Sequence, residues 1–131
     1  MRLKLSKQKT LEFETLRNLY RLLFNFSSSL IGKNKTRELL DDSYEKILPY
    51  FQSLKRYHIN ETNDLVLESK IVTEKEFLSF TVWIQQFIKD LKKFMVGLSK
   101  LDIQTITSEI KDELEEVGFY EYYKQATELE Y

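Results

Sequence analysis

The segment from Thr73 to Leu98 constrains the fold of this 131-residue chain more than any other feature. Its apolar residues recur every three or four positions, at Phe77, Phe80, Ile84, Phe87, Ile88, Leu91, Met95 and Leu98. This spacing places them on one side of an α-helix, and about 26 residues at 1.5 Å each give a rod of roughly 39 Å. Because such a helix needs partners along its whole length, the sequence predicts an all-α bundle of about five helices around one long central helix.

The composition agrees with this prediction and excludes several classes of protein. Three glycines and one proline are too few for a turn-rich β fold, and 131 residues predict a single helical domain over residues 1–131. The absence of cysteine excludes disulfides and thiolate nucleophiles. Residues 1–10 are polar and basic, and no run of 18 apolar residues occurs, so we expect a cytoplasmic protein that has no contact with a membrane.

Charge is distributed unevenly along the chain, although the net charge is only −1. Residues 1–37 carry nine Lys or Arg against two Glu, whereas residues 107–131 carry eight acids against Lys111 and Lys124. One interpretation is a basic end for an acidic partner and an acidic end for a basic partner. The other is that antiparallel helices bring the two ends together and neutralise them within the molecule.

The first helix is predicted to begin at Thr10, a suitable N-cap followed by Glu12 and Glu14 in the first turn. Serines at 27–29 and the polar residues 32–35 predict a turn after this helix.

The second helix is predicted to begin at Asp42, with Glu45 three residues later as a modified capping box. Its apolar spacing continues across Pro49 to Leu54, which favours a kinked helix over two separate elements. Residues 58–63 are polar enough for a loop. Residues 65–72 are predicted to form a short helix or to join the long one.

The remaining elements follow from local signals. The sequence from Thr73 to Glu76 has the form of a capping box and predicts the start of the long helix. After Lys100 we expect a linker with an extended turn, and then a short helix that ends at Gly118, a suitable C′ residue. A last helix is predicted to begin at Phe119.

The chain offers no convincing catalytic or metal-binding arrangement. His58 is the single histidine, and its position next to Lys55 and Arg56 predicts a residue at a helix end or on the surface. Four carboxylates share one helical face, which is more often solvated than metal-bound, at Glu109, Asp112, Glu113 and Glu116. No glycine-rich phosphate loop occurs. We therefore expect a non-enzymatic protein with no cofactor and no metal.

Four lysines cluster toward the end of the long predicted helix, at Lys89, Lys92, Lys93 and Lys100. One interpretation is contact with nucleic-acid phosphates, which would be salt-sensitive and independent of base sequence. The other is a favourable interaction of positive charge with the negative end of the helix dipole.

Aromatic side chains are the strongest indication of a protein partner. Trp83 lies beside Ile84 and Phe87 on the long helix, and four aromatics fall within five residues at Phe119, Tyr120, Tyr122 and Tyr123. These four side chains point in different directions around one helix, and a small core does not bury all of them. Some of them are therefore predicted to bind a partner. The alternative is a C-terminal helix that closes the bundle with its tyrosine hydroxyls in water.

Residues 38–47, followed by Phe51 and Leu54, resemble the helical domain of archaeal GINS subunits, in which an acidic cap leads an aromatic residue into the second helix. The run at 84–91, near the end of the long helix, and the Thr-Ser-Glu sequence at 107–109 also resemble that family. The resemblance covers the helical domain alone and implies a short form of the subunit.

The resemblance implies a non-enzymatic DNA replication factor, part of a hetero-oligomer that supports the replicative helicase and touches nucleic acid weakly or indirectly. The apolar helix and aromatic tail would then bury subunit interfaces, and the mixed charges would fix their orientation. The alternative is the small helical subunit of a type III CRISPR effector, which lines an RNA or DNA groove. That function requires a continuous basic face, which the four lysines supply in part.

Overall fold

The computed structural model describes residues 12–67, 69–95, 97–98 and 100–129, and it confirms the all-α fold class. Six α-helices occur in these residues, with one small hairpin and two 3-10 helices. In chain order the elements are α1 (Phe13–Ile31), α2 (Lys33–Ile47), η2 (Gln52–Arg56), β1 (Tyr57–Ile59), β2 (Leu65–Leu67), α3 (Glu74–Phe94), α4 (Ile103–Ile106), η3 (Ser108–Ile110), α5 (Lys111–Glu116) and α6 (Phe119–Ala126).

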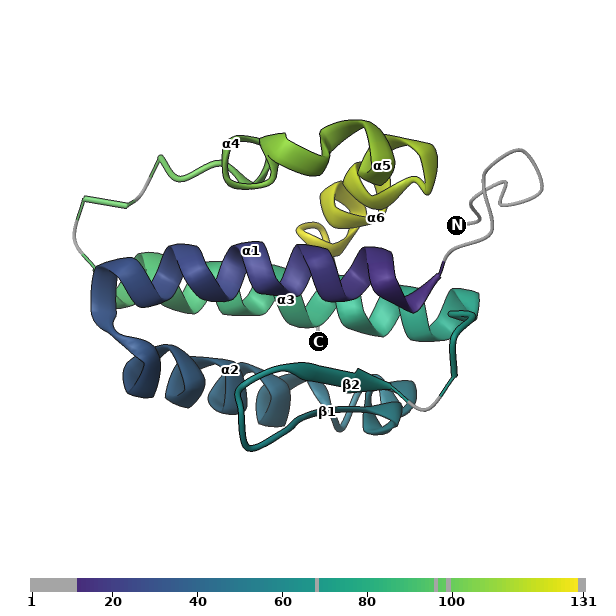
Figure 1. The fold of residues 1–131 in the computed structure, drawn as a ribbon, viewed down its shortest axis with the longest axis horizontal. Helices are drawn as coiled ribbons and strands as arrows, with labels where there is room; N and C mark the ends of the chain where they lie inside the picture. The colour runs from purple at the N-terminus through teal and green to yellow at the C-terminus, as the bar shows by residue number, and fades with distance from the viewer. Residues whose placement is uncertain (1–11, 68, 96, 99, 130–131) are drawn as a thin grey trace.

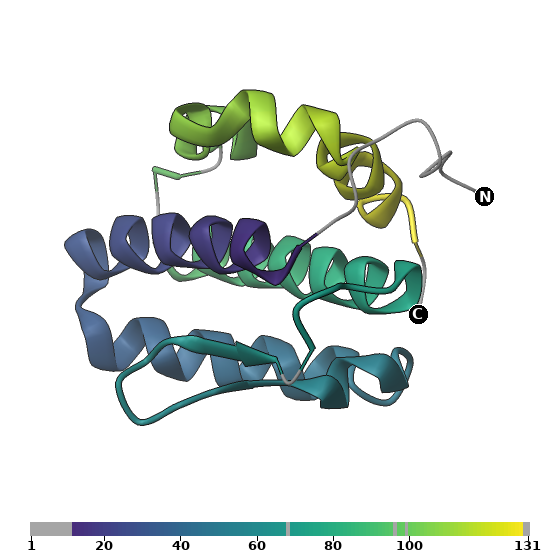
Figure 2. The same ribbon diagram turned by 45° about the vertical axis from the view of Figure 1, so that its right-hand side comes forward.

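The helices form three layers, with α1 and α3 in the middle (Figure 1). The helix α2 and the β1–β2 hairpin lie on one side of this pair, and α4, α5 and α6 lie on the other, as the turned view also shows (Figure 2). As the longest helix, α3 packs against α2, η2 and α6. The predicted long central helix is therefore present, although it ends at Phe94 and not at Leu98, because Met95 has extended backbone angles.

The predicted capping box begins α3. The Thr73 hydroxyl accepts a hydrogen bond from the Glu76 amide at 3.2 Å, and the Glu76 carboxylate accepts one from the Thr73 amide at 3.0 Å. Both bonds satisfy backbone donors that the first helical turn would otherwise leave free. The start of the long helix is therefore determined by the residues of its own first turn, as predicted.

The turn between α1 and α2 is shorter than predicted. All three serines remain helical, because the Ser27 hydroxyl is buried and lies 2.7 Å from that of Thr36, so it has a tertiary partner. Gly32 breaks the helix with a φ of 86°, and α2 begins at the next residue. Asp42 therefore lies inside α2, and the prediction that it caps a helix was wrong. Thr10 lies outside the described residues, and Glu12 is the N-cap of α1.

The region after α2 differs most from the prediction. Because α2 ends at Ile47, Pro49 separates α2 from η2, and the predicted continuous helix to Leu54 was wrong. The helix predicted over residues 65–72 was also wrong, since residues 65–67 form β2, which pairs antiparallel with β1. Leu65 and Leu67 point into the core on alternate positions, the period of a strand.

The Arg37 side chain, which belongs to α2, stabilises the turn of the β1–β2 hairpin. Its guanidinium donates to the carbonyls of Ile59 and Asn60 at 3.2 and 3.1 Å and to the Asn63 side chain at 3.0 Å. Asn63 has a positive φ of 65°, and its carbonyl also accepts a hydrogen bond of 2.7 Å from the Tyr20 hydroxyl. Four contacts from α1 and α2 therefore stabilise this turn, which lies in the loop predicted over residues 58–63, although the strand pairing that flanks it was not predicted.

The C-terminal layer follows the prediction more closely. Residues 103–106 form α4 where a linker was expected, because the Asp102 carboxylate accepts a hydrogen bond from the Gln104 amide at 3.0 Å and begins a turn. Gly118 follows α5 with a left-handed φ of 79°, as predicted for a C′ glycine, and α6 begins at Phe119.

Candidate functional site

Trp83 belongs to the core, and none of its surface is exposed for contact with a partner. Its side chain is 0% exposed, and its indole N–H donates to the Leu40 carbonyl and the Ser43 hydroxyl, both at 3.1 Å. The Tyr44 ring packs edge-on against it with 5.3 Å between ring centroids. This burial corrects the interpretation of Trp83 as a partner contact, because α2 covers the side of α3 that carries it.

The aromatic residues of α6 divide into two pairs. Phe119 and Tyr122 are buried against Phe77 of α3, with ring centroids 6.5 and 4.6 Å from it, and the Tyr122 hydroxyl donates to Glu74 at 2.9 Å. Residues 119, 122 and 126 lie three or four positions apart and form the buried face of the helix. Two of the four predicted contact residues are therefore core residues, which favours the interpretation that α6 closes the bundle.

Tyr120 and Tyr123 are half-buried and retain some exposed surface. The Tyr120 hydroxyl lies 2.6 Å from that of Thr107, so it serves to link α6 to the end of α4. Burial, and to a smaller extent the nearby Asp102 carboxylate, raises the pKa of Tyr123 above its usual value. Tyr123 borders a hollow of the surface.

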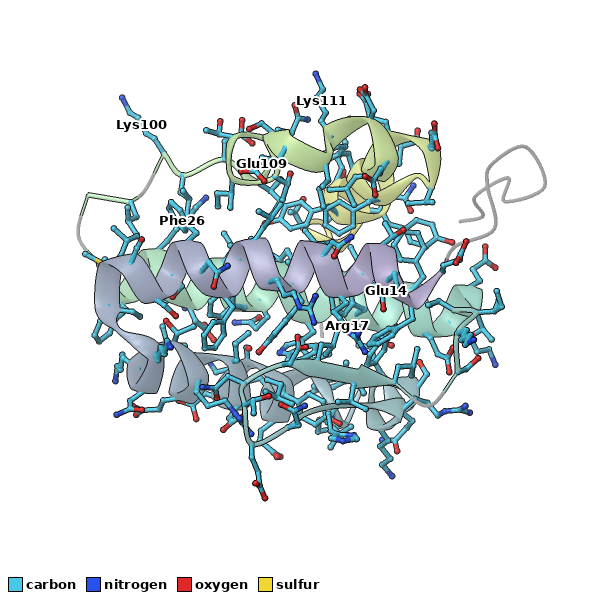
Figure 3. The ribbon with its side chains drawn as sticks, in the orientation of Figure 1. Glu14, Arg17, Phe26, Lys100, Glu109 and Lys111 are labelled. Carbon is cyan, nitrogen blue, oxygen red and sulfur yellow. The ribbon has the colours of Figure 1, made fainter. Side chains whose placement is uncertain are left out.

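The four clustered lysines are not one patch. Lys89 and Lys92 line a groove between α3 and the C-terminal helices, whereas Lys93 lines a second hollow on the α2 side. Lys100 lies in the connection from α3 to α4, and its side chain projects away from the body of the protein (Figure 3). The structure therefore places Lys89 and Lys92 together with Tyr123 and separates Lys93 and Lys100 from them.

The groove that contains Lys89 and Lys92, which we call the α3–α6 groove, has a volume of about 400 Å³. Its walls come from α3, from the segment before and at the start of α4, and from α6. The lining residues are Gln85, Ile88, Lys89, Lys92, Leu101, Asp102, Ile103, Tyr123 and Thr127. The groove is thus lined by apolar side chains together with positively and negatively charged groups.

A second surface was missed in the sequence, at the end of the molecule where α1 passes into α2 and α3 ends (Figures 1 and 2). Leu30 is 40% exposed and Phe94 is 47% exposed, and the Lys35 ammonium lies 4.7 Å from the centroid of the Phe94 ring. Lys35 contacts Phe94, and Leu30 lies one residue before the end of α1, at the same end of the molecule. We call these three residues the α1–α2 corner. Its sequence signal was Phe94, which lies seven residues after the buried Phe87 and so continues the apolar face of the long helix to its end.

The cations of α1 and α2 pair with acids close to them. Arg17 pairs with Glu14, Arg21 with Asp64, Lys35 with Glu38, and Arg37 with Asp41, at 2.6–3.2 Å. These acids lie on α1, α2 and the hairpin. The ion pairs formed by these four cations therefore do not depend on the acidic C-terminal segment.

His58 lies exposed on β1 and not at a helix end, because the segment that precedes it continues into a strand. In the part of the chain that the structure describes, no group of three or more histidines and acids is arranged to hold a metal ion. Within the same residues, no helix has both the length and the apolar character that crossing a membrane requires.

The candidate surfaces of this chain are thus the α3–α6 groove and the α1–α2 corner. Both consist of side chains that tertiary structure brings together from separate helices. No protein-family model, no curated protein and no solved structure matches the chain.

Proposed function

We propose that this protein is a non-enzymatic subunit of a multiprotein assembly and docks onto another subunit through the α1–α2 corner. The observation that carries the proposal is the exposure of Phe94 and Leu30 at one end of the molecule. Large apolar and aromatic side chains are enriched in the buried centres of protein interfaces, where a few of them supply most of the binding energy.

Charge around the corner supports the same proposal. Lys33 and Lys93 are exposed at the start of α2 and the end of α3, and Lys35 lies over the Phe94 ring. A polar rim around apolar side chains is the usual anatomy of an interface, and its charges guide the partner into register. An acidic rim on the partner would complement these lysines.

Among such assemblies, we propose a GINS-type DNA replication complex that supports the replicative helicase. This choice rests on the sequence resemblance of residues 38–47 and 84–91 to the helical domain of archaeal GINS subunits. Only the second run keeps its expected place in the fold, because residues 38–47 lie inside α2 and do not form the acidic cap of that family. The second of these runs lies in the C-terminal half of α3, the half that leads to Phe94. A hetero-oligomer in the cytoplasm, with helicase components attached, is the expected form of the protein.

The test is purification of the tagged chain from its own cell, followed by native mass spectrometry. The double variant Leu30→Ser with Phe94→Ser is expected to recover about tenfold less of the complex, because it removes the apolar centre of the corner. The matched control is Ile71→Ser with Leu129→Ser, since these side chains are 51% and 43% exposed and lie outside the corner. The control is expected to assemble as the wild type does.

Thermal unfolding of each purified variant separates loss of binding from loss of folding. Equal recovery of the complex by the corner variant and the wild type would overturn the docking proposal. A complex that depends on the corner but contains no replication protein would overturn the GINS assignment and leave the docking surface supported.

A further inference from the structure

The α3–α6 groove follows two turns of the central helix. Gln85, Ile88, Lys89 and Lys92 lie three or four positions apart and line one wall, so residues 85–92 extend about 10 Å along it. Tyr123 of α6 and Thr127, the residue that caps the end of α6, lie on another wall. A groove of this form has room for an extended small molecule or a short length of chain.

The two lysines of this groove have no ion-pair partner among the described residues, unlike several other cations of the molecule. For comparison, the Lys46 ammonium lies 3.0 and 3.1 Å from the two carboxylate oxygens of Asp90 on the opposite side of α3. Lys89 and Lys92 lie three residues apart on α3, where like charges repel each other. An anion placed between them would remove this repulsion.

Two further polar groups of the groove, on Tyr123 and Asp102, are also available. The Tyr123 hydroxyl forms no hydrogen bond with another described side chain or carbonyl, and like any tyrosine hydroxyl at neutral pH it is protonated and can donate. The Asp102 carboxylate uses one oxygen for the Gln104 amide, which leaves the other free to accept. The apolar wall between these groups consists of Leu101, which is half-buried, with smaller exposed parts of Ile88 and Ile103.

We propose that the α3–α6 groove binds a nucleotide phosphate. Lys89 and Lys92 hold the phosphate oxygens as point charges, and the Tyr123 hydroxyl donates to the same group. The apolar wall covers one side of the base, and the free Asp102 oxygen accepts from a sugar hydroxyl or a base amino group. An isolated carboxylate or inorganic anion would use the lysines but not the apolar wall or Asp102. This inference is independent of the docking role of the α1–α2 corner.

The phosphate has two possible sources, a free mononucleotide or a single strand of nucleic acid. Titration of the isotope-labelled full chain with AMP and, separately, with a twelve-residue oligouridine tests both by amide chemical shifts. Shifts centred on Ile88, Lys92, Tyr123 and Thr127 are expected with at least one probe. Saturation by AMP assigns the site to free nucleotides, whereas a response to the oligonucleotide alone assigns it to a strand.

The double variant Lys89→Gln with Lys92→Gln is expected to weaken binding of the active probe by about tenfold or more, because each ammonium loses a charge-assisted contact. The matched control is Lys55→Gln with Lys111→Gln, which removes the same charge from η2 and from α5, where Lys111 points outward (Figure 3). Tyr123→Phe keeps the ring and removes the hydroxyl, and it is expected to weaken binding several-fold. For the strand, the salt dependence of binding should lose about 1.4 in slope when both lysines are replaced.

The proposal is overturned if neither probe shifts the groove amides. It is also overturned if the groove variant and the control variant lose the same affinity, because binding would then follow net charge and not the site. Spectra of each variant without probe confirm that the fold is intact before affinities are compared.

Discussion

At the scale of single residues, exposure separates aromatic side chains that looked alike in the sequence. Trp83 and Phe94 both lie on α3, but α2 covers Trp83 completely, whereas Phe94 belongs to the last turn and remains 47% exposed. The buried indole N–H has two acceptors, which is the usual requirement for a tryptophan inside a core. Trp83 therefore contributes to stability, and Phe94 is available for binding.

The substitution Trp83→Phe is expected to lower the free energy of unfolding by about 2–4 kcal/mol. It removes one ring of the indole from a packed site and leaves the Ser43 hydroxyl without its donor. Urea denaturation followed by circular dichroism measures the change. The control, Phe94→Ser, is expected to lower the free energy of unfolding by less than about 1 kcal/mol, because about half of the Phe94 surface is exposed to solvent. A smaller cost at Trp83 than at Phe94 would contradict the assignment of these two roles.

The ion pair between Arg21 and Asp64 makes stability depend on pH in a defined direction. Hydrogen bonds from the Arg21 guanidinium, at 3.1 and 2.6 Å, hold the pKa of Asp64 below its usual value. Because the folded pKa is the lower one, the stabilisation is present above the pKa of the unfolded aspartate and is lost as pH falls through the folded pKa.

Arg21→Gln is accordingly expected to destabilise the protein by about 0.5–1 kcal/mol at neutral pH, since the pair is partly exposed and screened by solvent. The difference from the wild type should shrink as the solution is acidified, which thermal melts across a pH series would show. A difference that stays constant at low pH would mean that Arg21 acts through packing and not through the Asp64 charge.

At the scale of elements, sequence signals predicted a helix start correctly where a nearby residue forms the capping hydrogen bonds. They failed where contacts with residues distant in sequence determine the local structure. Thr73 caps α3 as its sequence predicts, because its partner Glu76 is three residues away. Asp42 has the same kind of signal but lies inside α2, where the fold has already begun a helix at Lys33. The β1–β2 hairpin was missed because contacts from Arg37 and Tyr20, distant in sequence, hold its turn.

Substitution of the two residues that carry a capping signal, Thr73 and Asp42, is expected to affect stability differently. Thr73→Ala is expected to lower the free energy of unfolding by about 1 kcal/mol, because the first turn of α3 loses a side-chain acceptor. Asp42→Ala should be neutral or slightly stabilising, since alanine is the better residue inside a helix. Paired denaturation curves provide the comparison. An equal loss for both variants would show that Asp42 also caps a helical segment.

At the scale of the whole molecule, the sequence was sufficient for the fold class and for the central helix but not for the surfaces. Periodicity over residues 73–98 predicted α3, because burial repeats with the helical period. Lys89, Lys92 and Tyr123 were recognised as separate features, and their meeting in one groove depends on how α6 packs against α3. Leu30 and Phe94 share one end of the molecule because α1 and α3 both end there, which no local pattern records.

Photo-crosslinking from the α1–α2 corner in the native cell is the most direct test of the docking function. A photoreactive phenylalanine analogue at position 94 is predicted to form a covalent adduct with another protein subunit, whereas the same analogue at position 129, which is also exposed, is predicted to form none. Adducts from position 129 alone, or no adduct from position 94 in cells where the chain is present in a large complex, would contradict the account.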